Sequence, residues 1–378
     1  MDAAARLKNH QDIYAPPYYH IYFQYFYSPL FALILLPFTF LPFSVFETLW
    51  VMFMFFCLYD IWKMSKEYFD TRNFSNQKNL VWLFGTLFFI LSFILYNISQ
   101  IQMTVFLLWA TLCSLKMFDK KRFLPGGILL GLVINIKIMP IIFLPYLIYR
   151  NQWRAAACTM IFFFVFIYIP AIFIGWQYNQ ELLHSWWSSI NPANSQYSIE
   201  TSRLLVSLNS TIPVFLTETK GEMNLRRNIV NLDYRTAILI TNIIRIGLVL
   251  LSLAFFRTKP FVKMNDKTRV YWETSYLFLL TPLIFPHQNK YAYFYLLPAF
   301  TYLCYYIITN WKKVNKAFFC IILIISFIYT PFIGTDIIGH FLFDLLQYYR
   351  IQVLCTLLLI PVLLFYSPDK LASRRSPK

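Results

Sequence analysis

The chain is poor in glycine and in charged residues, and both shortages narrow the classes of protein to which it can belong. Only 9 of its 378 residues are glycine, and no GxGxxG or GxxxxGK[ST] sequence occurs. Charged residues make up 13% of the chain, against roughly 25% in an ordinary soluble domain. The shortage of glycine therefore disfavours a domain that binds nucleotides through glycine-rich phosphate loops. The shortage of charge disfavours an ordinary soluble protein.

Short motifs for metal ions and catalytic nucleophiles are also missing. No CxxC, DxD or GxSxG sequence is present, and the histidines are far apart: His10, His20, His184, His287 and His340. The cysteines all lie in apolar runs, at Cys57, Cys113, Cys158, Cys304, Cys320 and Cys355. We therefore expect no disulfide bonds, no zinc site and no cofactor.

Apolar residues dominate instead. The chain is 58% hydrophobic and 20% aromatic, with a mean hydropathy of +0.53, so its natural solvent is lipid. The net charge of +16 fits the lysine and arginine excess of cytoplasmic loops in membrane proteins. Binding to nucleic acid is not expected, because no basic stripe with interleaved aromatics is present.

Runs of about 18 or more apolar residues predict helices that cross the bilayer. They are Phe43–Trp62, Leu80–Tyr96, Ile101–Met117, Ala155–Trp176, Ala237–Phe256, Tyr291–Thr309, Ala317–Gly334 and Ile351–Tyr366. Three further segments are short or broken: Leu30–Leu41, Phe123–Tyr149 and Thr274–Phe285. The first is expected to be re-entrant or interfacial, and the second to be a hairpin or two half-length helices with Lys137 near the turn. The predicted fold class is an all-α polytopic membrane protein with about ten to twelve transmembrane or re-entrant helices.

The distribution of basic residues predicts which face each loop occupies. Basic clusters are expected in the cytoplasm: Lys63 to Lys78, Lys116 to Arg122, Arg150 with Arg154, Arg257 to Arg269, Lys312 to Lys316, and the tail 367–378. Tryptophans at the ends of apolar runs are expected to anchor the interface: Trp62, Trp82, Trp153, Trp176, Trp272 and Trp311.

The opposite face would hold the external loop 1–28, the turn Asn97–Gln102, the turn at Lys137, the long external loop 177–236, Pro286–Lys290 and Thr335–Tyr349. All five histidines fall there, so the chemistry is expected to be extracytoplasmic, within one transmembrane domain over residues 1–378. Because no hydrophobic segment precedes the first external loop, we expect that a first transmembrane helix is missing from this chain, through a misplaced start codon or a truncation.

Lys137 and His287 are the first candidates for a site. A lysine inside an apolar hairpin is costly and tends to be functional, although a snorkelling lysine is the alternative. His287 follows a segment interrupted by Pro282, and broken segments often mark binding sites in membrane proteins. Its neighbours Gln288 and Lys290 extend a polar run that suits phosphate or sugar hydroxyls, with an ordinary polar turn as the alternative.

Arg245, Gln100 and Gln102 are further candidates. Arg245 lies inside an apolar run, where it would bind a lipid phosphate or snorkel outward. The amides of Gln100 and Gln102 suit sugar hydroxyls because each amide both donates and accepts hydrogen bonds; capping of helix ends is the alternative. A general base is also needed, and spacing does not rank the external carboxylates: Asp2, Asp12, Glu181, Glu200, Glu218, Glu222, Asp233, Asp336 and Asp344.

Several motifs in this order resemble glycosyltransferase family 87, a group of GT-C-type membrane mannosyltransferases and related enzymes. They are Asp2 to Leu7 with Asp12-Ile13-Tyr14, Tyr27-Ser28-Pro29-Leu30 with Leu41-Pro42 and Trp50, Ser99 to Gln102, Gly127 and Gly131 with Lys137 and Pro140, Asn209-Ser210-Thr211, and Pro282 with Phe285, His287 and Gln288. The Lys-x-x-Pro segment is the best match. Two motifs depart from the family's pattern. The glycine and asparagine on either side of Gln100 are replaced here, and so are the tryptophan and second histidine near His287.

The resemblance implies a GT-C-like helical bundle that transfers a mannose-like hexose from a polyprenyl-phosphate sugar to a glycan or glycolipid hydroxyl, with inversion. Lys137, His287, Lys290 and Arg245 would hold the donor phosphate. Gln100, Gln102, Asn209 and Gln288 would bind sugar hydroxyls. The family's base is an aspartate of the first external loop, to which Asp2 is the nearest carboxylate. A bacterial inner membrane is the implied location.

Two other classes stay open from the sequence. A transporter or flippase of lipid-linked sugars would show symmetry-related repeats of hydropathy, and none is visible. A membrane acyltransferase or glycan ligase would favour an arginine-rich external loop, and Arg203, Arg226, Arg227 and Arg235 lie in the long one.

Overall fold

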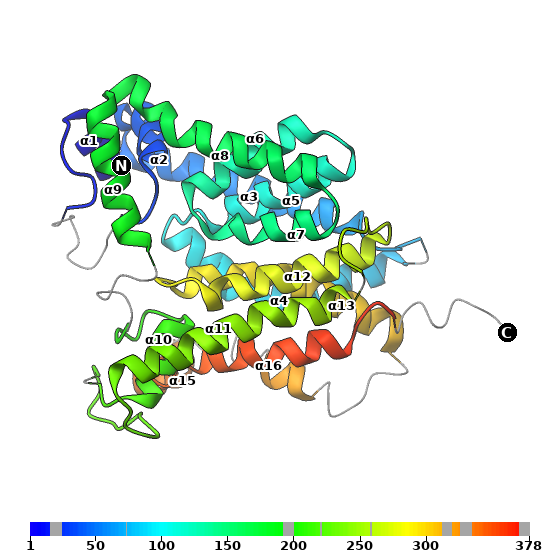
Figure 1. The fold of residues 1–378 in the computed structure, drawn as a ribbon. Coiled ribbons are helices and arrows are strands. Elements are labelled where there is room, and N and C mark those ends of the chain that lie inside the picture. Colours follow the sequence, from blue (N-terminus) through cyan, green and yellow to red (C-terminus); the bar gives the residue numbers. More distant parts are fainter. Residues whose placement is uncertain are drawn as a thin grey trace. The chain divides into compact units, whose positions relative to one another are not determined.

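A computed structural model describes residues 1–15, 25–72, 74–191, 200–219, 221–257, 259–311, 320–325 and 335–369, and most of these residues are helical. The helices before residue 200 are α1 (Asp2–Lys8), α2 (Pro29–Leu35), η1 (Leu36–Phe40), α3 (Phe43–Lys66), α4 (Asn76–Ser99), α5 (Thr104–Asp119), α6 (Phe123–Ile136), η2 (Met139–Ile142), α7 (Phe143–Tyr149), α8 (Trp153–Ile174) and α9 (Trp176–Ile190). After residue 200 follow α10 (Leu208–Leu216), α11 (Tyr234–Phe256), α12 (Lys267–Ile284), η4 (Lys290–Leu296), α13 (Leu297–Asn310), α15 (Thr335–Tyr348) and α16 (Ile351–Phe365) (Figure 1).

Five of the described helices are long and apolar enough to cross a membrane: α3, α4, α8, α11 and the continuous segment Lys290–Asn310. The segments Ile338–Tyr348 and Ile351–Phe365, bent by 64°, raise the number to six if they form one span. These helices coincide with predicted apolar runs. The expected span at Ile101–Met117 is the 16-residue helix α5, and most of Ala317–Gly334 lies outside the described residues.

The irregular segments have the following structures. The expected re-entrant segment Leu30–Leu41 consists of the short helices α2 and η1. The segment Phe123–Tyr149 is indeed divided into two short helical parts at Lys137. Thr274–Phe285 is different from expectation, because it belongs to the 18-residue helix α12, which continues through Pro282. The segment 177–236, which was expected to be a long external loop, contains most of α9 and all of α10.

The chain divides into two compact units. Unit 1 comprises Met1–Ile61, Val105–Asn194 and Pro260–Lys263. In it, α6 packs closely along α8, since Gly127 and Gly131 leave no side chain between them. An added Cβ at Gly131 would lie 2.9 Å from the backbone nitrogen of Phe163, and one at Gly127 would lie 2.6 Å from Cβ of Cys158. This spacing of small residues is typical of close helix pairs in membranes.

A small hydrophobic cluster of unit 1 joins the N-terminal segment to α2 and α9. It contains Ala3, Leu7, Ile13, Tyr14, Ala32, Leu182 and Trp186. Residues 3–14 are therefore packed through apolar side chains rather than held as a free polar loop.

Unit 2 comprises Trp62–Thr104, Ser195–Lys259 and Met264–Lys378. Its central helix is α12, which contacts α11, α13, α16 and η4 and whose residues from Tyr271 to Leu283 are all buried. Two of the tryptophans expected at the membrane interface instead belong to this core. Trp82 and Trp272 are fully buried, and their indole N–H groups donate to the carbonyls of Thr301 and Leu363, each at 2.9 Å, so burial leaves neither donor unpaired. Trp153, Trp176 and Trp311 are exposed, as an interface position requires.

Candidate functional site

In unit 1, the break between α6 and η2 interrupts the helical hydrogen bonds beside Lys137. A continuing helix would pair the carbonyl of Ile136 with the nitrogen of residue 140, but Pro140 has no N–H. That carbonyl instead accepts from the backbone N–H of Ser28 at 3.4 Å. Lys137 adopts an extended conformation, with φ −145° and ψ 120°, so the chain changes direction at this residue.

The side chain of Lys137 is 9% exposed and its Nζ lies 5.5 Å from the centre of the Tyr27 ring, within the range of a cation–π interaction. The Ser28 hydroxyl lies 2.8 Å from Oδ1 of Asn135, and the hydroxyl of Tyr14 donates to the carbonyl of Tyr27 at 2.8 Å. Two motifs identified separately in the sequence, Tyr27-Ser28-Pro29 and the Lys-x-x-Pro segment, therefore meet in one buried polar site.

The predicted base Asp2 lies in the first turn of α1 and is exposed. It forms no salt bridge within the described part of the chain. Neighbouring Ala3 and Leu7 face the hydrophobic cluster of α2 and α9, so the folded helix α1 places Asp2 on its outer side.

In unit 2, the polar run after α12 meets the segment that leads into α10. Leu205 and Asn289 form an isolated antiparallel bridge, and the N–H of Val206 donates to the carbonyl of Gln288 at 2.7 Å. These contacts place the turn at His287 against residues 200–209, more than 75 positions earlier in the sequence.

Glu200 is the centre of this junction. Its side chain is 3% exposed, and its Oε1 accepts from the backbone N–H of His287 at 2.6 Å and lies 3.0 Å from Nδ1 of the same residue. Its other oxygen, Oε2, accepts from the Ser207 hydroxyl at 2.9 Å. His287 has a φ of 58°, a left-handed conformation that is uncommon for a side chain of this size. The contacts of Glu200 hold that conformation and orient the imidazole.

The helix α10 begins next to Glu200 and carries Asn209. Ser207 caps it through a reciprocal capping box with Ser210. Asn209 contacts α11 in the same unit. The guanidinium of Arg245 on α11 donates to Oδ1 of Asn209 and to Oδ1 of Asn242 at 2.9 Å. The predicted phosphate ligand Arg245 and the predicted sugar ligand Asn209 are therefore directly hydrogen-bonded.

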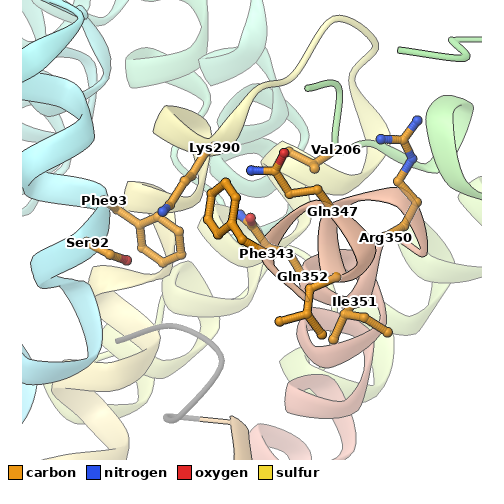
Figure 2. Close-up of a pocket in the computed structure, with 10 residues that line it drawn as sticks. Ser92, Phe93, Val206, Lys290, Phe343, Gln347, Arg350, Ile351 and Gln352 are labelled. Carbon is orange, nitrogen blue, oxygen red and sulfur yellow. The ribbon is translucent and has the colours of Figure 1, made fainter. Parts of the chain in front are cut away.

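Lys290 lines a small cavity of about 50 Å³ together with Ser92, Phe93, Gln347 and Arg350. Its side chain extends toward Phe93, while the guanidinium of Arg350 points away from that ring (Figure 2). The Nζ of Lys290 also lies 5.8 Å from the ring centre of Tyr96. Lys290 thus places a positive charge at the edge of a space that admits a small group.

The three predicted glutamines differ in accessibility. Gln288 is buried and its amide nitrogen donates to the carbonyl of Pro286. Gln100 is exposed and Gln102 is half-buried, in a turn that follows α4. Near that turn, Asn97 donates to the carbonyl of Tyr291 at 3.0 Å, so the Gln100 turn and the start of η4 are neighbours within unit 2.

Sequence reasoning missed two residues that organise this site, Glu200 and Arg350. Arg350 is fully buried; its Nε donates to the carbonyl of Ser210 at 3.0 Å and its Nη2 to that of Ser202 at 2.7 Å. Glu200 was one of nine carboxylates that were expected to be external and that spacing did not rank. The partners of both residues are far away in sequence, so only the folded chain distinguishes them. Within the described residues no group of three metal-ligating side chains occurs.

Comparisons with known proteins agree on one class. The sequence model of glycosyltransferase family 87 matches residues 25–268, more than half of the chain. A polyprenol-phosphate-mannose-dependent alpha-(1-2)-phosphatidylinositol pentamannoside mannosyltransferase of Mycolicibacterium smegmatis is 26% identical over 160 residues. That alignment covers 42% of this chain and 38% of the length of the relative. No solved structure matches the chain.

Proposed function

Since the chain belongs to glycosyltransferase family 87, we propose that it transfers a hexose, mannose or a similar sugar, from a polyprenyl-phosphate donor to a hydroxyl group of a glycan or glycolipid. The observation that carries this proposal is the family match over residues 25–268, supported by the mannosyltransferase relative. The matched range includes both Tyr27 and Lys137, whose side chains are in contact.

Inversion at the anomeric carbon is part of the proposal. The acceptor oxygen attacks C1 of the sugar, the bond from C1 to the phosphate oxygen breaks, and the electron pair of that bond stays on the phosphate. A nearby cation stabilises this growing negative charge. A base takes the acceptor proton, and Asp2 is the nearest carboxylate to the position that the family implies.

The proposed roles follow the two sites described above. In unit 1, Lys137 would bind the donor phosphate. In unit 2, His287, Lys290 and Arg245 are the other candidates for binding the donor phosphate, with Glu200 as a positioning residue that orients His287. Asn209, Gln100, Gln102 and Gln288 would bind sugar hydroxyls. His287, Gln288 and Lys290 lie outside the residues that the family model matches.

The proposed setting is a GT-C-like bundle of ten to twelve transmembrane or re-entrant helices in a bacterial inner membrane, with the site on the extracytoplasmic face. The apolar helices support a multi-pass membrane protein. The basic loops support the orientation, because excess lysine and arginine is typical of cytoplasmic loops and none of the polar residues assigned to the site lies in them.

A direct assay tests the proposal. The full chain, purified and reconstituted in liposomes, is incubated with polyprenyl-phosphate [14C]mannose and a lipid extract as acceptor. We expect radioactive sugar in a new glycolipid or glycan, with no divalent metal required. Transfer only from a polyprenyl-diphosphate oligosaccharide would identify a glycan ligase instead, and movement of the donor across the bilayer without transfer would identify a flippase.

A further inference from the structure

A second cavity of unit 2, about 930 Å³ in volume, lies in the segment between α10 and α11. Residues 218–219 and 221–231 contribute most of its lining, and Tyr348 of α15 forms another part of its wall. Its polar lining includes Arg226, Arg227, Asn224 and Asn228. The cavity is large enough for a sugar or a polar headgroup, and none of the residues assigned above to the donor lines it.

Arg227 is the unusual residue of this cavity. It is 5% exposed, and its guanidinium lies 4.5 Å from the ring centre of Tyr348. One nitrogen, Nη2, donates to the Thr219 hydroxyl at 3.2 Å. The other two nitrogens, Nε and Nη1, are buried and have no hydrogen-bond partner among the described residues. Buried donors without acceptors are costly, above all in a charged group.

Arg227 also forms no salt bridge with a carboxylate in the described part of the chain. The nearby carboxylate of Glu222 is engaged with Arg203 at 2.7 Å. Burial accordingly lowers the pKa of Arg227 from its usual value, since it removes water from the charged form. An anion in the adjacent cavity would supply the missing negative charge.

The cavity wall is held in place before any ligand arrives. The Tyr348 hydroxyl donates to the carbonyl of Leu225 at 2.6 Å, and the Tyr349 hydroxyl donates to that of Arg226 at 3.0 Å. The N–H of Ile229 donates to the carbonyl of Phe215 at 2.8 Å. A preformed site loses less entropy on binding than a flexible one, so these bonds favour a binding role over an incidental gap.

The surroundings of the cavity contain both hydroxyl-binding and apolar groups. The amides of Asn224 and Asn228 can donate to and accept from hydroxyls. Leu225, Ile229 and Val230 are apolar and exposed, in the same segment as the two arginines. This combination fits an anionic, hydroxylated group, either free or attached to a lipid chain.

We propose that this cavity binds a phosphate-bearing, hydroxylated headgroup, with Arg227 paired to the phosphate and Asn224 and Asn228 bonded to the hydroxyls. The identification of that headgroup as part of the acceptor rests on the proposed transferase function. The binding itself does not depend on it.

Binding is tested with the purified full chain in a neutral detergent. Calorimetric titration with glycerol 3-phosphate and with glycerol measures the soluble group, and native mass spectrometry with phosphatidylglycerol and diacylglycerol measures the lipid-linked one. We expect the phosphate-bearing member of at least one pair to bind and the neutral member not to bind. Binding of glycerol 3-phosphate alone would indicate a free ligand, and binding of phosphatidylglycerol alone a lipid headgroup. The proposal is overturned if, in both pairs, the phosphate-bearing member binds no more tightly than the neutral member.

Three substitutions assign the binding to the cavity. Arg227→Gln should weaken it about 10- to 100-fold, the factor expected for loss of a charge-assisted hydrogen bond. Asn224→Asp adds a negative charge on the exposed cavity wall without touching a described hydrogen bond, so it should weaken binding severalfold and leave the fold intact. The matched control Arg235→Gln removes an exposed arginine at the start of α11 and should change nothing. Unchanged binding in both cavity variants, or equal loss in the control, would contradict the assignment.

Transfer assays separate this inference from the proposed function. If the cavity serves the acceptor, Asn224→Asp should raise the KM for the acceptor with little change in kcat. If the protein shows no transferase activity but still binds phosphate through Arg227, the binding site is supported and only its role in transfer is rejected.

Discussion

Nδ1 of His287 lies 3.0 Å from Oε1 of Glu200, and the backbone N–H of the same histidine donates to that oxygen at 2.6 Å. A single buried carboxylate therefore fixes both the backbone turn and the ring of a residue 87 positions further along the chain. This arrangement makes Glu200 the residue of unit 2 whose replacement is most informative.

Glu200→Gln should lower sugar transfer and stability together. The amide keeps an acceptor oxygen but removes the charge, and a hydrogen bond to a charged group contributes about 1.5–3 kcal/mol. We expect the free energy of unfolding to fall by a similar amount, and the transfer rate to fall by up to about 100-fold if the whole loss appears in the transition state. Initial rates and chemical denaturation measure the two effects. Glu47→Gln, which changes an exposed glutamate of α3 that is not a candidate base, is the control; an equal loss there would reject a special role for Glu200.

Lys137→Met should abolish most donor turnover without unfolding the protein. Removal of one group that stabilises a growing negative charge typically costs about 10²- to 10³-fold in rate. Stability should be unchanged or higher, because an apolar side chain replaces a buried charge. The measurement is kcat with polyprenyl-phosphate mannose, compared with thermal unfolding. Lys120→Met, at an exposed lysine after α5, is the matched control. Full activity of Lys137→Met would show that the lysine has only a structural contact with Tyr27.

Arg245 and Asn209 should be energetically coupled. Because their side chains are hydrogen-bonded, the double variant Arg245→Gln with Asn209→Ala should lose less stability than the two single variants added together, by about 0.5–3 kcal/mol. Chemical denaturation of the four proteins completes this cycle. A second cycle of Arg245→Gln with Asn76→Ala, at an exposed residue of α4, should be additive within about 0.5 kcal/mol. Coupling in both cycles would point to a general loss of structure instead.

Gly131→Ala should destabilise unit 1 through the packing of α6 on α8. The new Cβ would lie 2.9 Å from the backbone nitrogen of Phe163, so the helices must move apart, and such overpacking costs about 1–3 kcal/mol. Gly247→Ala is a suitable comparison, since an added Cβ there meets no atom within 4 Å and alanine favours the helix. Denaturation in detergent should show a loss for the first variant and no loss for the second. The reverse order would contradict the described helix pair.

The membrane-spanning helices were predictable from the sequence because their signal is local. An apolar run of sufficient length must form a helix in lipid, whatever it packs against, and α3, α4, α8 and α11 coincide with such runs. The interruption at Lys137 was also predictable, since Pro140 removes a hydrogen-bond donor that a continuous helix requires. Trp82 and Trp272 were misplaced because the end of an apolar run does not reveal whether lipid or protein surrounds a side chain.

The sequence by itself determined the all-helical class, the long apolar spans, the motifs shared with glycosyltransferase family 87 and the identity of the polar residues available for a site. The tertiary structure decided which of them meet: Tyr27 with Lys137, Asn209 with Arg245, and Glu200 with His287. The physical reason is that a span depends on hydropathy along a continuous segment, whereas a buried polar contact depends on the packing of segments far apart in the chain. Only that packing removes water from Glu200 and Arg227. Once buried, each side chain needs a polar partner, which a neighbouring residue or a ligand can supply.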